Sequence, residues 1–253
     1  MATDAPIAAV VLAAGKGTRM GSSRAKVLHE LLGRALIVYP LEVARRLGAC
    51  RTVVVVGHQK DDVIDAVRSA FPDARDSIGF VEQAEQLGTG HAVLCALPGL
   101  VGFDGPVLIL SGDVPLVSES SLRALIDGCR DSGSGLAAAT FRPADPTGYG
   151  RMLRDADGKL VDIREQRDAS ADERAIGECN AGIYCVLAEH LRRDLPRIGR
   201  SNTQNEVYLT ELVQLGVQRG SVAAVELPVR EATGINTQAQ LVALGEEMAN
   251  SRG

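Results

Sequence analysis

The stretch VVLAAGKGTRMGSSRAKVLHEL (residues 10–31) begins as a buried strand and then changes character. Its apolar run ends at Gly15 and Gly17, and two lysines and two arginines lie within the residues around and after this turn. A glycine turn between a strand and cationic residues frees backbone N–H groups to face phosphate oxygens. The stretch therefore predicts a polyanion site at the end of the first strand.

Two familiar phosphate-binding motifs do not fit this turn. A P-loop requires GxxxxGK[ST], which is not present after Gly15. A dinucleotide fingerprint requires GxGxxG, but Met20 stands at the third glycine, and the second strand ends in Gly57 and His58 without an acidic residue for a ribose. Two interpretations remain open on this stretch alone: a loop that wraps a nucleoside triphosphate, and a solvated surface loop with incidental charge.

The composition of the chain limits the classes of protein to which it can belong. The chain has 253 residues, 45% hydrophobic and 23% charged, which is typical of a soluble globular protein with one large α/β domain or two smaller ones. The formal net charge of -5 argues against broad binding to nucleic acid or an anionic membrane. No apolar run has the roughly 20 residues of a membrane span, and the N-terminus lacks a basic leader. We expect a cytoplasmic protein.

The cysteines and histidines do not indicate a transition-metal site. They include no CxxC pair and no HExxH spacing. Cys179 and Cys185 share one face of an expected strand, which favours small buried side chains. An odd number of cysteines fits a reducing compartment: Cys50, Cys95, Cys129, Cys179 and Cys185.

Apolar runs alternate with amphipathic stretches in the first half. Three short runs, residues 7–14, 52–57 and 106–113, are almost continuously hydrophobic, as strands covered on both faces must be. Helical patterns occupy residues 35–47, 60–70 and 89–97, and another begins at Ser118 or Ser120 as N-cap. This order predicts an α/β fold, with a Rossmann-like, mostly parallel sheet flanked by helices.

The second half is richer in β-structure. After residue 135 come several strand-like runs and a hairpin with an Asp157-Gly158 turn. Residues 205–220 are predicted to form an amphipathic helix, residues 221–229 a late strand, and residues 237–250 a last helix.

Several short runs resemble those of a known family. LAAGKGTRM and AKVLHEL resemble the LxxGxGTRM and PKxL signature of sugar-phosphate nucleotidyltransferases. Six further runs follow in order: QAEQLGTGHA (residues 83–92), SGDVPL (111–116), DPTGYGR (145–151), ECNAGIY (178–184), NEVYLTE (205–211) and GIN (234–236). Together they resemble the uridyltransferase domain of the GlmU family of bifunctional uridyltransferase/acetyltransferases, over almost the whole chain.

The resemblance implies a reaction and an organisation. UMP would pass from UTP to N-acetylglucosamine-1-phosphate by in-line attack at the α-phosphorus, with Mg²⁺ as cofactor, giving UDP-N-acetylglucosamine and pyrophosphate. Such a transfer requires positioning and charge neutralisation, without a nucleophilic side chain. Residues 1–253 would form a single domain, with a nucleotide-binding half (1–132), a sugar-binding part (133–236) and a C-terminal helix (237–253).

The resemblance also implies roles for individual residues. Arg19, Lys26 and Asp113 would be catalytic, and Asp113 and Asn236 would hold the metal. The nucleotide would be bound by ten residues: Leu12, Ala13, Ala14, Gly15, Lys26, Gln83, Gly88, Thr89, Ser111 and Gly112. The sugar would be bound by Gly150, Glu165, Asn180 and Asn236, with Tyr149 beside them. On local sequence alone, Asp113 before Pro115 also fits an Asx turn, and Glu165 and Asn180 also fit surface polar positions.

The chain departs from the family pattern in three places. Ala25 stands where proline usually precedes the lysine, so we expect a looser loop. Ser111 replaces an aromatic residue near the ribose, so we expect altered affinity. No hexapeptide repeats of the acetyltransferase β-helix follow, so we expect no acetyltransferase activity and a monomer or weak dimer.

Other functions stay open at this point. The same chemistry with another sugar phosphate or nucleotide is one alternative, and a non-catalytic sugar-nucleotide-binding module is another. The presence of Arg19, Lys26 and Asp113 together favours catalysis, because a pure binding module gains little from all three charges.

Overall fold

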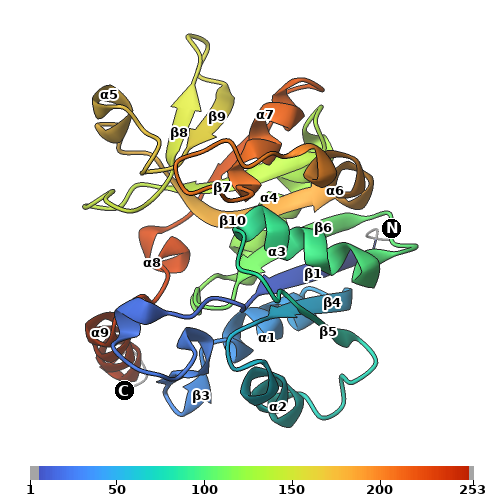
Figure 1. Cartoon of the computed structure of the whole chain (residues 1–253), viewed down its shortest axis with the longest axis vertical. Helices are drawn as coiled ribbons and strands as arrows, with labels where there is room; N and C mark the ends of the chain where they lie inside the picture. The colour runs from blue at the N-terminus through green and yellow to red at the C-terminus, as the bar shows by residue number, and fades with distance from the viewer. Residues whose placement is uncertain (1–5, 251–253) are drawn as a thin grey trace.

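The structure, a computed structural model, describes residues 6–250 (Figure 1). Its first half contributes four parallel strands in the spatial order β6-β1-β4-β5. Their bounds are Ile7–Leu12 for β1, Ala49–Val56 for β4, Ile78–Glu82 for β5 and Pro106–Ser111 for β6. The three strands predicted at residues 7–14, 52–57 and 106–113 are therefore confirmed, and β5 joins them at the edge.

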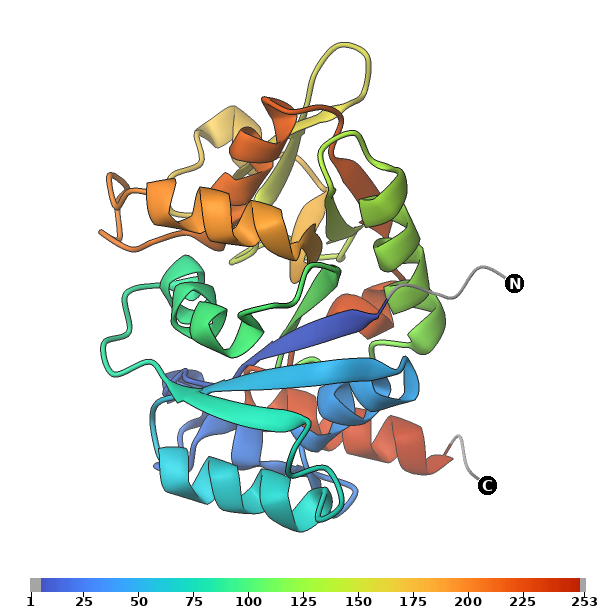
Figure 2. The same ribbon diagram turned by 90° about the vertical axis from the view of Figure 1, so that its right-hand side faces the viewer.

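Both faces of this sheet are covered by helices, as the continuous hydrophobicity of the strands predicts. Ile7, Ala9 and Val11 point to one face, and Ala8 and Val10 to the other. Figure 2 shows α2 and α3 on opposite sides of the strands. The first face packs on α1 (Val38–Arg46), α2 (Lys60–Ala70) and α4 (Glu119–Asp131), and the second on α3 (Thr89–Ala96), α6 (Ala188–Asp194) and α7 (Leu212–Val217).

The second half extends the same sheet instead of forming a separate one. Strand β10 (Cys179–Leu187) lies antiparallel between β6 and β7 (Leu136–Phe141), and β11 (Ala223–Glu226) pairs parallel with β7. The predicted hairpin is β8 (Arg151–Arg154) and β9 (Leu160–Arg164), which joins through β8 to β10. Within residues 6–250 the result is a sheet of nine strands, so the predicted α/β class with a mostly parallel first half is confirmed.

One predicted helix begins later than expected, and two others agree with the prediction. Ser118 is the N-cap of α4 as predicted, since its hydroxyl accepts a hydrogen bond from the Ser121 N–H at 3.2 Å. The helix predicted for residues 35–47 begins only at Val38, because Arg34–Ala35 forms β3 and pairs with β2 (Glu30–Leu31). The last helix, α9 (Gln238–Asn250), is confirmed.

The helix predicted for residues 205–220 is the largest error. Asn205 lies in the left-handed region, with φ 54°. The Val207 N–H donates to the Leu87 carbonyl at 2.7 Å, and the Val207 carbonyl accepts from the Gly90 N–H at 2.8 Å. Backbone groups bonded to a neighbouring segment cannot also bond within a helix. Helical structure therefore starts at Leu209.

The strand predicted for residues 221–229 is shorter, because α8 (Val229–Ala232) begins at its end. None of the helices between residues 6 and 250 has the length and apolar content that a membrane span requires. Short helical segments complete the chain: α5 (Ala171–Arg174) and the 3-10 turns Thr18–Met20, Lys26–Leu28, Leu97–Leu100, Leu195–Arg197 and Leu209–Glu211.

A small apolar cluster joins the two ends of the described chain. Met20, in the turn after β1, is buried with Leu31 and Leu36 from the region of the β2–β3 hairpin. Ile235 and Leu241, from the last part of the chain, complete this cluster. Helix α9 therefore lies against the N-terminal segment, as Figure 1 shows beside β3.

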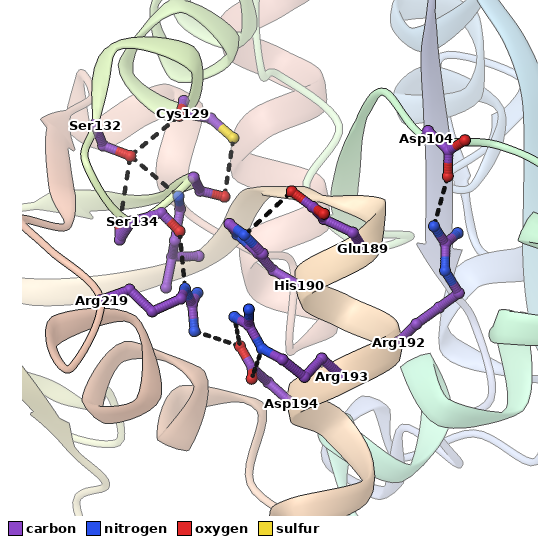
Figure 3. Close-up of polar contacts among 12 residues, drawn as sticks. Asp104, Cys129, Ser132, Ser134, Glu189, His190, Arg192, Arg193, Asp194 and Arg219 are labelled. Atoms are coloured by element: carbon purple, nitrogen blue, oxygen red, sulfur yellow. Dashed lines mark hydrogen bonds and ion pairs between the residues drawn. The ribbon is translucent and has the colours of Figure 1, made fainter.

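A buried carboxylate anchors the helices of the second face (Figure 3). Asp194, at the end of α6, is fully buried and accepts from the Arg193 Nε at 2.9 Å. Arg219 also donates to Asp194 and reaches the Leu215 carbonyl at 2.9 Å and the Ser134 carbonyl at 3.2 Å. Two helices and the turn before β7 therefore meet at one negative charge.

The arginines keep Asp194 ionised. Burial alone would raise the pKa of this carboxyl, but the hydrogen bond from Arg193 and the charges of Arg219 and Arg193 outweigh burial and hold the pKa below its ordinary value. The stability that Asp194 contributes is therefore present above the ordinary pKa of an aspartate and is lost as the pH falls through the lowered pKa.

We expect Asp194→Asn to lower the free energy of unfolding by about 2 kcal/mol at neutral pH, because charge-assisted hydrogen bonds are lost and arginines remain unpaired. Urea unfolding measures this change. The difference from the wild type should shrink as the pH falls below the ordinary pKa of an aspartate and through the lowered pKa of the native carboxyl. Asp104→Asn is the control, since Asp104 pairs with Arg192 at 2.6 Å but is 82% exposed and should change stability little. Equal effects of both substitutions would contradict the anchoring role.

Candidate functional site

The site lies where the strand order reverses. From β1 the chain proceeds to β4 on one side, and it later returns to place β6 on the other side. Ligands of open α/β sheets bind outside the carboxyl ends of strands at such a reversal. Here Leu12 and Ser111 are paired in register, so the loops after β1 and β6 leave the sheet side by side.

The loop after β1 turns sharply at glycines. Gly17 has φ 65°, in the left-handed region that favours glycine, and Gly21 has φ 62°. A Cβ added at Gly17 would stand 2.4 Å from the Cβ of Lys26, whereas one added at Gly21 would meet nothing within 4 Å. Gly17 is therefore needed both for its conformation and for the close approach of the segment that carries Lys26.

Ala25 does not leave this loop unconstrained, although it replaces the expected proline. Its φ of −54° and ψ of 136° lie where a proline would also lie. Its N–H, which a proline would not have, donates to the Gln59 side-chain oxygen. Buried packing and this bond hold the loop, so the predicted loosening is not what the backbone geometry indicates.

Four side chains predicted for catalysis and metal binding meet in one network. Lys26 Nζ contacts Asp113 and donates to Asn236 Oδ1 at 3.0 Å. Arg19 Nη2 donates to the same Asn236 oxygen at 2.8 Å. The hydroxyl of Ser111 donates to Asp113 Oδ1 at 2.6 Å, so Ser111 orients this carboxylate. The network joins the ends of β1 and β6 to the segment before α9.

Two adjoining cavities flank this network. The first, of about 350 Å³, is lined by nine of the ten predicted nucleotide residues. The second, of about 640 Å³, is lined by Arg19 and by every predicted sugar residue. Five residues line both cavities and so form their border: Leu12, Lys26, Thr89, Ser111 and Asp113. The tenth predicted nucleotide residue, Gly112, lines neither cavity, and its N–H donates to the Leu12 carbonyl at 2.9 Å.

The far wall of the first cavity comes from the end of β5 and the start of α3. Gly88 has φ 104°, and a Cβ there would stand 2.6 Å from the Val207 carbonyl oxygen. The Thr89 hydroxyl accepts from the Leu209 N–H at 3.2 Å. Gln83 Nε2 donates to the Gly88 carbonyl at 3.0 Å. These contacts fix the wall against residues 207–209.

The predicted sugar residues lie together in the second cavity. The Asn180 N–H donates to the Gly150 carbonyl at 2.9 Å. Asn180 Nδ2 donates to the Tyr184 hydroxyl at 2.7 Å, and its Oδ1 accepts from the Gly182 N–H at 3.0 Å. An amide has two hydrogens and two lone pairs, so one of each remains for a ligand.

Burial changes the titration of two side chains in this cavity. It raises the pKa of the Glu165 carboxyl above its ordinary value, while a hydrogen bond from Thr210 acts in the opposite direction. Burial also raises the pKa of the Tyr149 hydroxyl, and the Asp113 charge adds to this effect. Tyr149 packs edge-on against Phe141, with ring centroids 4.9 Å apart, which fixes its position beside Gly150.

The oxygen donors of the network fit a hard divalent cation. Among residues 6–250 no group of three or more His, Cys, Asp or Glu side chains could hold a metal ion. Magnesium, however, is bound through one or two carboxylates together with substrate phosphates and water. The Asp113 carboxylate and Asn236 Oδ1 converge on the Lys26 ammonium, so they already share a cation between them.

Sequence reasoning missed several residues of these cavities, and three of them form hydrogen bonds to residues that it did predict. Gln86 lines the first cavity and donates to the Ala14 carbonyl at 2.6 Å. Thr210 and Tyr184 line the second cavity and bond to Glu165 and Asn180. All three lie within the family-like runs QAEQLGTGHA, NEVYLTE and ECNAGIY, which was the available signal.

Two cations and a carboxylate therefore lie between two cavities at the point where the strand order reverses, and this arrangement fits the binding of phosphate groups. The profile of the MobA-like NTP transferase domain matches residues 9–192. The chain belongs to this family of NTP transferases.

Similar proteins agree with this assignment. The bifunctional protein GlmU of Anaeromyxobacter sp. (strain K) is 50% identical over 239 residues, which are 94% of this chain and 49% of that protein. GlmU of Pelobacter propionicus is 48% identical over 238 residues, 93% of this chain and 50% of that protein. The chain thus spans about half the length of the curated relatives it matches.

Among solved structures, the chain is similar to UDP-glucose pyrophosphorylase. The complex with UDP-glucose has a TM-score of 0.75 at 18% identity, covering 98% of this chain and 99% of that one. The apo form has a TM-score of 0.76 at 17% identity, covering 98% of this chain and 100% of that one. Because the sequence identity is this low, the structural similarity supports the assignment of the fold alone.

We expect Gly17→Ala to lower the melting temperature more than Gly21→Ala, as measured by thermal unfolding. Both substitutions place an L-residue in the left-handed region and so carry the same backbone strain. Only the Gly17 substitution adds a collision with Lys26. Equal shifts would show that strain alone acts and that the contact between Gly17 and Lys26 is not required.

Proposed function

We propose that this chain transfers UMP from UTP to N-acetylglucosamine-1-phosphate, forming UDP-N-acetylglucosamine and pyrophosphate. The proposal is supported by the likeness to GlmU at up to 50% identity and by the family-like runs along the chain. One observation carries it most directly. Lys26 and Asp113 border both cavities, where a phosphate between a nucleotide and a sugar would lie.

The chain's own side chains would neutralise charge during the transfer. An oxygen of the sugar phosphate attacks the α-phosphorus, and pyrophosphate leaves on the opposite side. Arg19 offers a planar pair of donors and Lys26 a mobile point charge, and both suit phosphate oxygens. To reach a phosphate, Lys26 exchanges its contact with Asp113 for the nucleotide, so substrate binding would release the carboxylate.

Asp113 and Asn236 are the residues that would hold Mg²⁺. The ion would supply charge neutralisation at the phosphate groups. Ser111 then acts as a positioning residue, because its hydroxyl fixes one oxygen of Asp113 at 2.6 Å. Ser111 stands where the family usually has an aromatic residue. It would lose a contact with the ribose, but it would orient Asp113 instead.

The sugar would occupy the second cavity. Glu165 accepts from sugar hydroxyls, and Asn180 offers its remaining hydrogen and lone pair. Gly150 lines this cavity without a side chain of its own, because a Cβ there would stand only 3.1 Å from the Ile163 side chain. Tyr149 closes the side of the cavity towards Asp113.

Pyrophosphate release tests the proposal. We expect release when UTP, N-acetylglucosamine-1-phosphate and Mg²⁺ are all present, and little when any one is omitted. A panel of sugar-1-phosphates with UTP, dTTP and CTP separates this activity from related ones. No release with any combination would support a non-catalytic binding module.

We expect Arg19→Ala and Asp113→Asn each to reduce turnover by more than about tenfold, because each removes electrostatic stabilisation at the reacting phosphate. Steady-state pyrophosphate release measures the change. Arg24→Ala is a matched control, since Arg24 lies on the same loop but pairs with Glu30 at 3.4 Å and is half exposed. A folded Asp113→Asn protein with near-normal turnover would exclude the metal-binding role.

We expect Glu165→Gln to weaken sugar binding and stabilise the protein at neutral pH. Because the pKa of Glu165 is raised, the folded state holds more protons than the unfolded state between the ordinary and the raised pKa. The stability contributed by Glu165 therefore falls as the pH rises through this window. The melting temperature of the variant should exceed that of the wild type by roughly 2 °C at neutral pH and match it near pH 4.

The neighbouring Asp168 provides the opposite case. Hydrogen bonds from Thr203 and Tyr208 hold its pKa below the ordinary value, so its contribution is present at neutral pH and lost in acid. Asp168→Asn should lower the melting temperature at neutral pH.

The functional readout for Glu165→Gln is a higher KM for the sugar phosphate, with no such change in the KM for UTP. An unchanged sugar KM would remove Glu165 from the site.

A further inference from the structure

Gln83 faces the first cavity with its side chain held by two acceptors. It follows β5, is only 5% exposed, and lines the cavity beside Gly88 and Thr89. Its Nε2 donates to the Gly88 carbonyl at 3.0 Å and lies 3.1 Å from His91 Nδ1. A carbonyl oxygen can only accept, so the amide atom beside Gly88 must be the nitrogen.

Both hydrogens of this amide are therefore used. One goes to the Gly88 carbonyl, and the other goes to His91 Nδ1, which accepts it. The side-chain oxygen, Oε1, has no hydrogen-bond partner within residues 6–250. For a molecule bound in the cavity, Gln83 thus offers an acceptor and no donor.

The tautomer of His91 follows from the same contacts. Since Nδ1 accepts, the ring hydrogen lies on Nε2. Nε2 is 3.8 Å from the Sγ of Cys95, one helical turn further along α3. Burial raises the pKa of the Cys95 thiol, so the sulfur stays protonated at neutral pH and acts as a weak acceptor. The donations thus run from the cavity wall to the helix, from the Gln83 amide to His91 and from His91 to the sulfur of Cys95.

We propose that His91 is a positioning residue for base selection: it fixes the Gln83 amide so that Oε1 faces the base and selects pyrimidines that carry a hydrogen on N3. The inference rests on the proposed function, in which the first cavity holds a uridine nucleotide. Uracil and thymine have an N3–H that donates to Oε1. Cytosine has a lone pair at N3, so two acceptors would meet, and leaving buried polar groups unpaired is costly.

The specificity depends on the amide not rotating. A flip of the Gln83 amide, which exchanges the positions of Oε1 and Nε2, would present a donor to the base and would suit cytosine. That rotation places Oε1 against the Gly88 carbonyl, which replaces a hydrogen bond by a repulsive contact. It also breaks the hydrogen bond to His91 Nδ1, which can form again only if the imidazole changes its tautomer. His91 thus supplies part of the restraint, although it does not line the cavity itself.

The experiment measures the ratio of kcat/KM for UTP to that for CTP in pyrophosphate release, and the ratio of the two dissociation constants by calorimetry. We expect His91→Leu to lower both ratios by roughly fivefold, because one of the two restraints is removed. We expect His91→Gln to restore the wild-type ratios within about twofold, since its amide oxygen accepts from Gln83. A residue with a merely structural role would lower both activities together and leave the ratios unchanged.

The outcomes separate this inference from the proposed function. A wild-type protein that turns over UTP in preference to CTP, with unchanged ratios in His91→Leu, overturns the role of His91 and leaves the proposed function intact. A wild-type protein that releases no pyrophosphate overturns the proposed function, and calorimetry then decides the inference alone. If the wild type binds UTP and CTP equally, the inference on His91 is overturned. If the wild type binds UTP more tightly than CTP and His91→Leu does not, the inference is supported.

Discussion

The pairing of β1 with β6 is the constraint on which the site depends. Leu12 and Ser111 are in register, so the two following loops leave the sheet at the same point. One loop brings Arg19 and Lys26, and the other brings Asp113. Like charges gathered at one point are unfavourable unless an opposite charge lies between them. Asp113 and the Asn236 oxygen provide this compensation, and they hold the cations ready for a polyanion.

The second half of the chain uses the same sheet to build the second cavity. Strand β10 lies antiparallel beside β6, so Asn180 at its start comes near the end of β6 where Asp113 stands. Glu178, just before it, is held by a bidentate contact from Arg154 and by the Thr140 hydroxyl, which fixes the start of the strand. The start of β10 is therefore rigidly connected to the end of β6, which would favour orientation over flexibility in the proposed transfer.

The sequence was sufficient for the buried strands, because continuous apolar runs with helices between them permit few folds other than a covered parallel sheet. The candidate site residues were predicted from short runs that resemble a family, and the structure brings Arg19, Lys26, Asp113 and Asn236 together. Non-local bonding could not be predicted. The periodicity of residues 205–220 favoured a helix, but Val207 bonds to Leu87 and Gly90 from another part of the chain. The contact of Gln59 with Ala25 and the orientation of Gln83 by His91 likewise depend on tertiary placement.

The cluster around Met20 makes the two ends of the described chain one mechanical unit. Met20 directly follows Arg19, and it is enclosed by Ile235 and Leu241 on the side of α9. Asn236, next to Ile235, holds the guanidinium of Arg19. A shift of the last helix along the β2–β3 hairpin would therefore be transmitted to the cationic loop without passing through the central sheet. Docking of α9 thus contributes to holding the first loop in place.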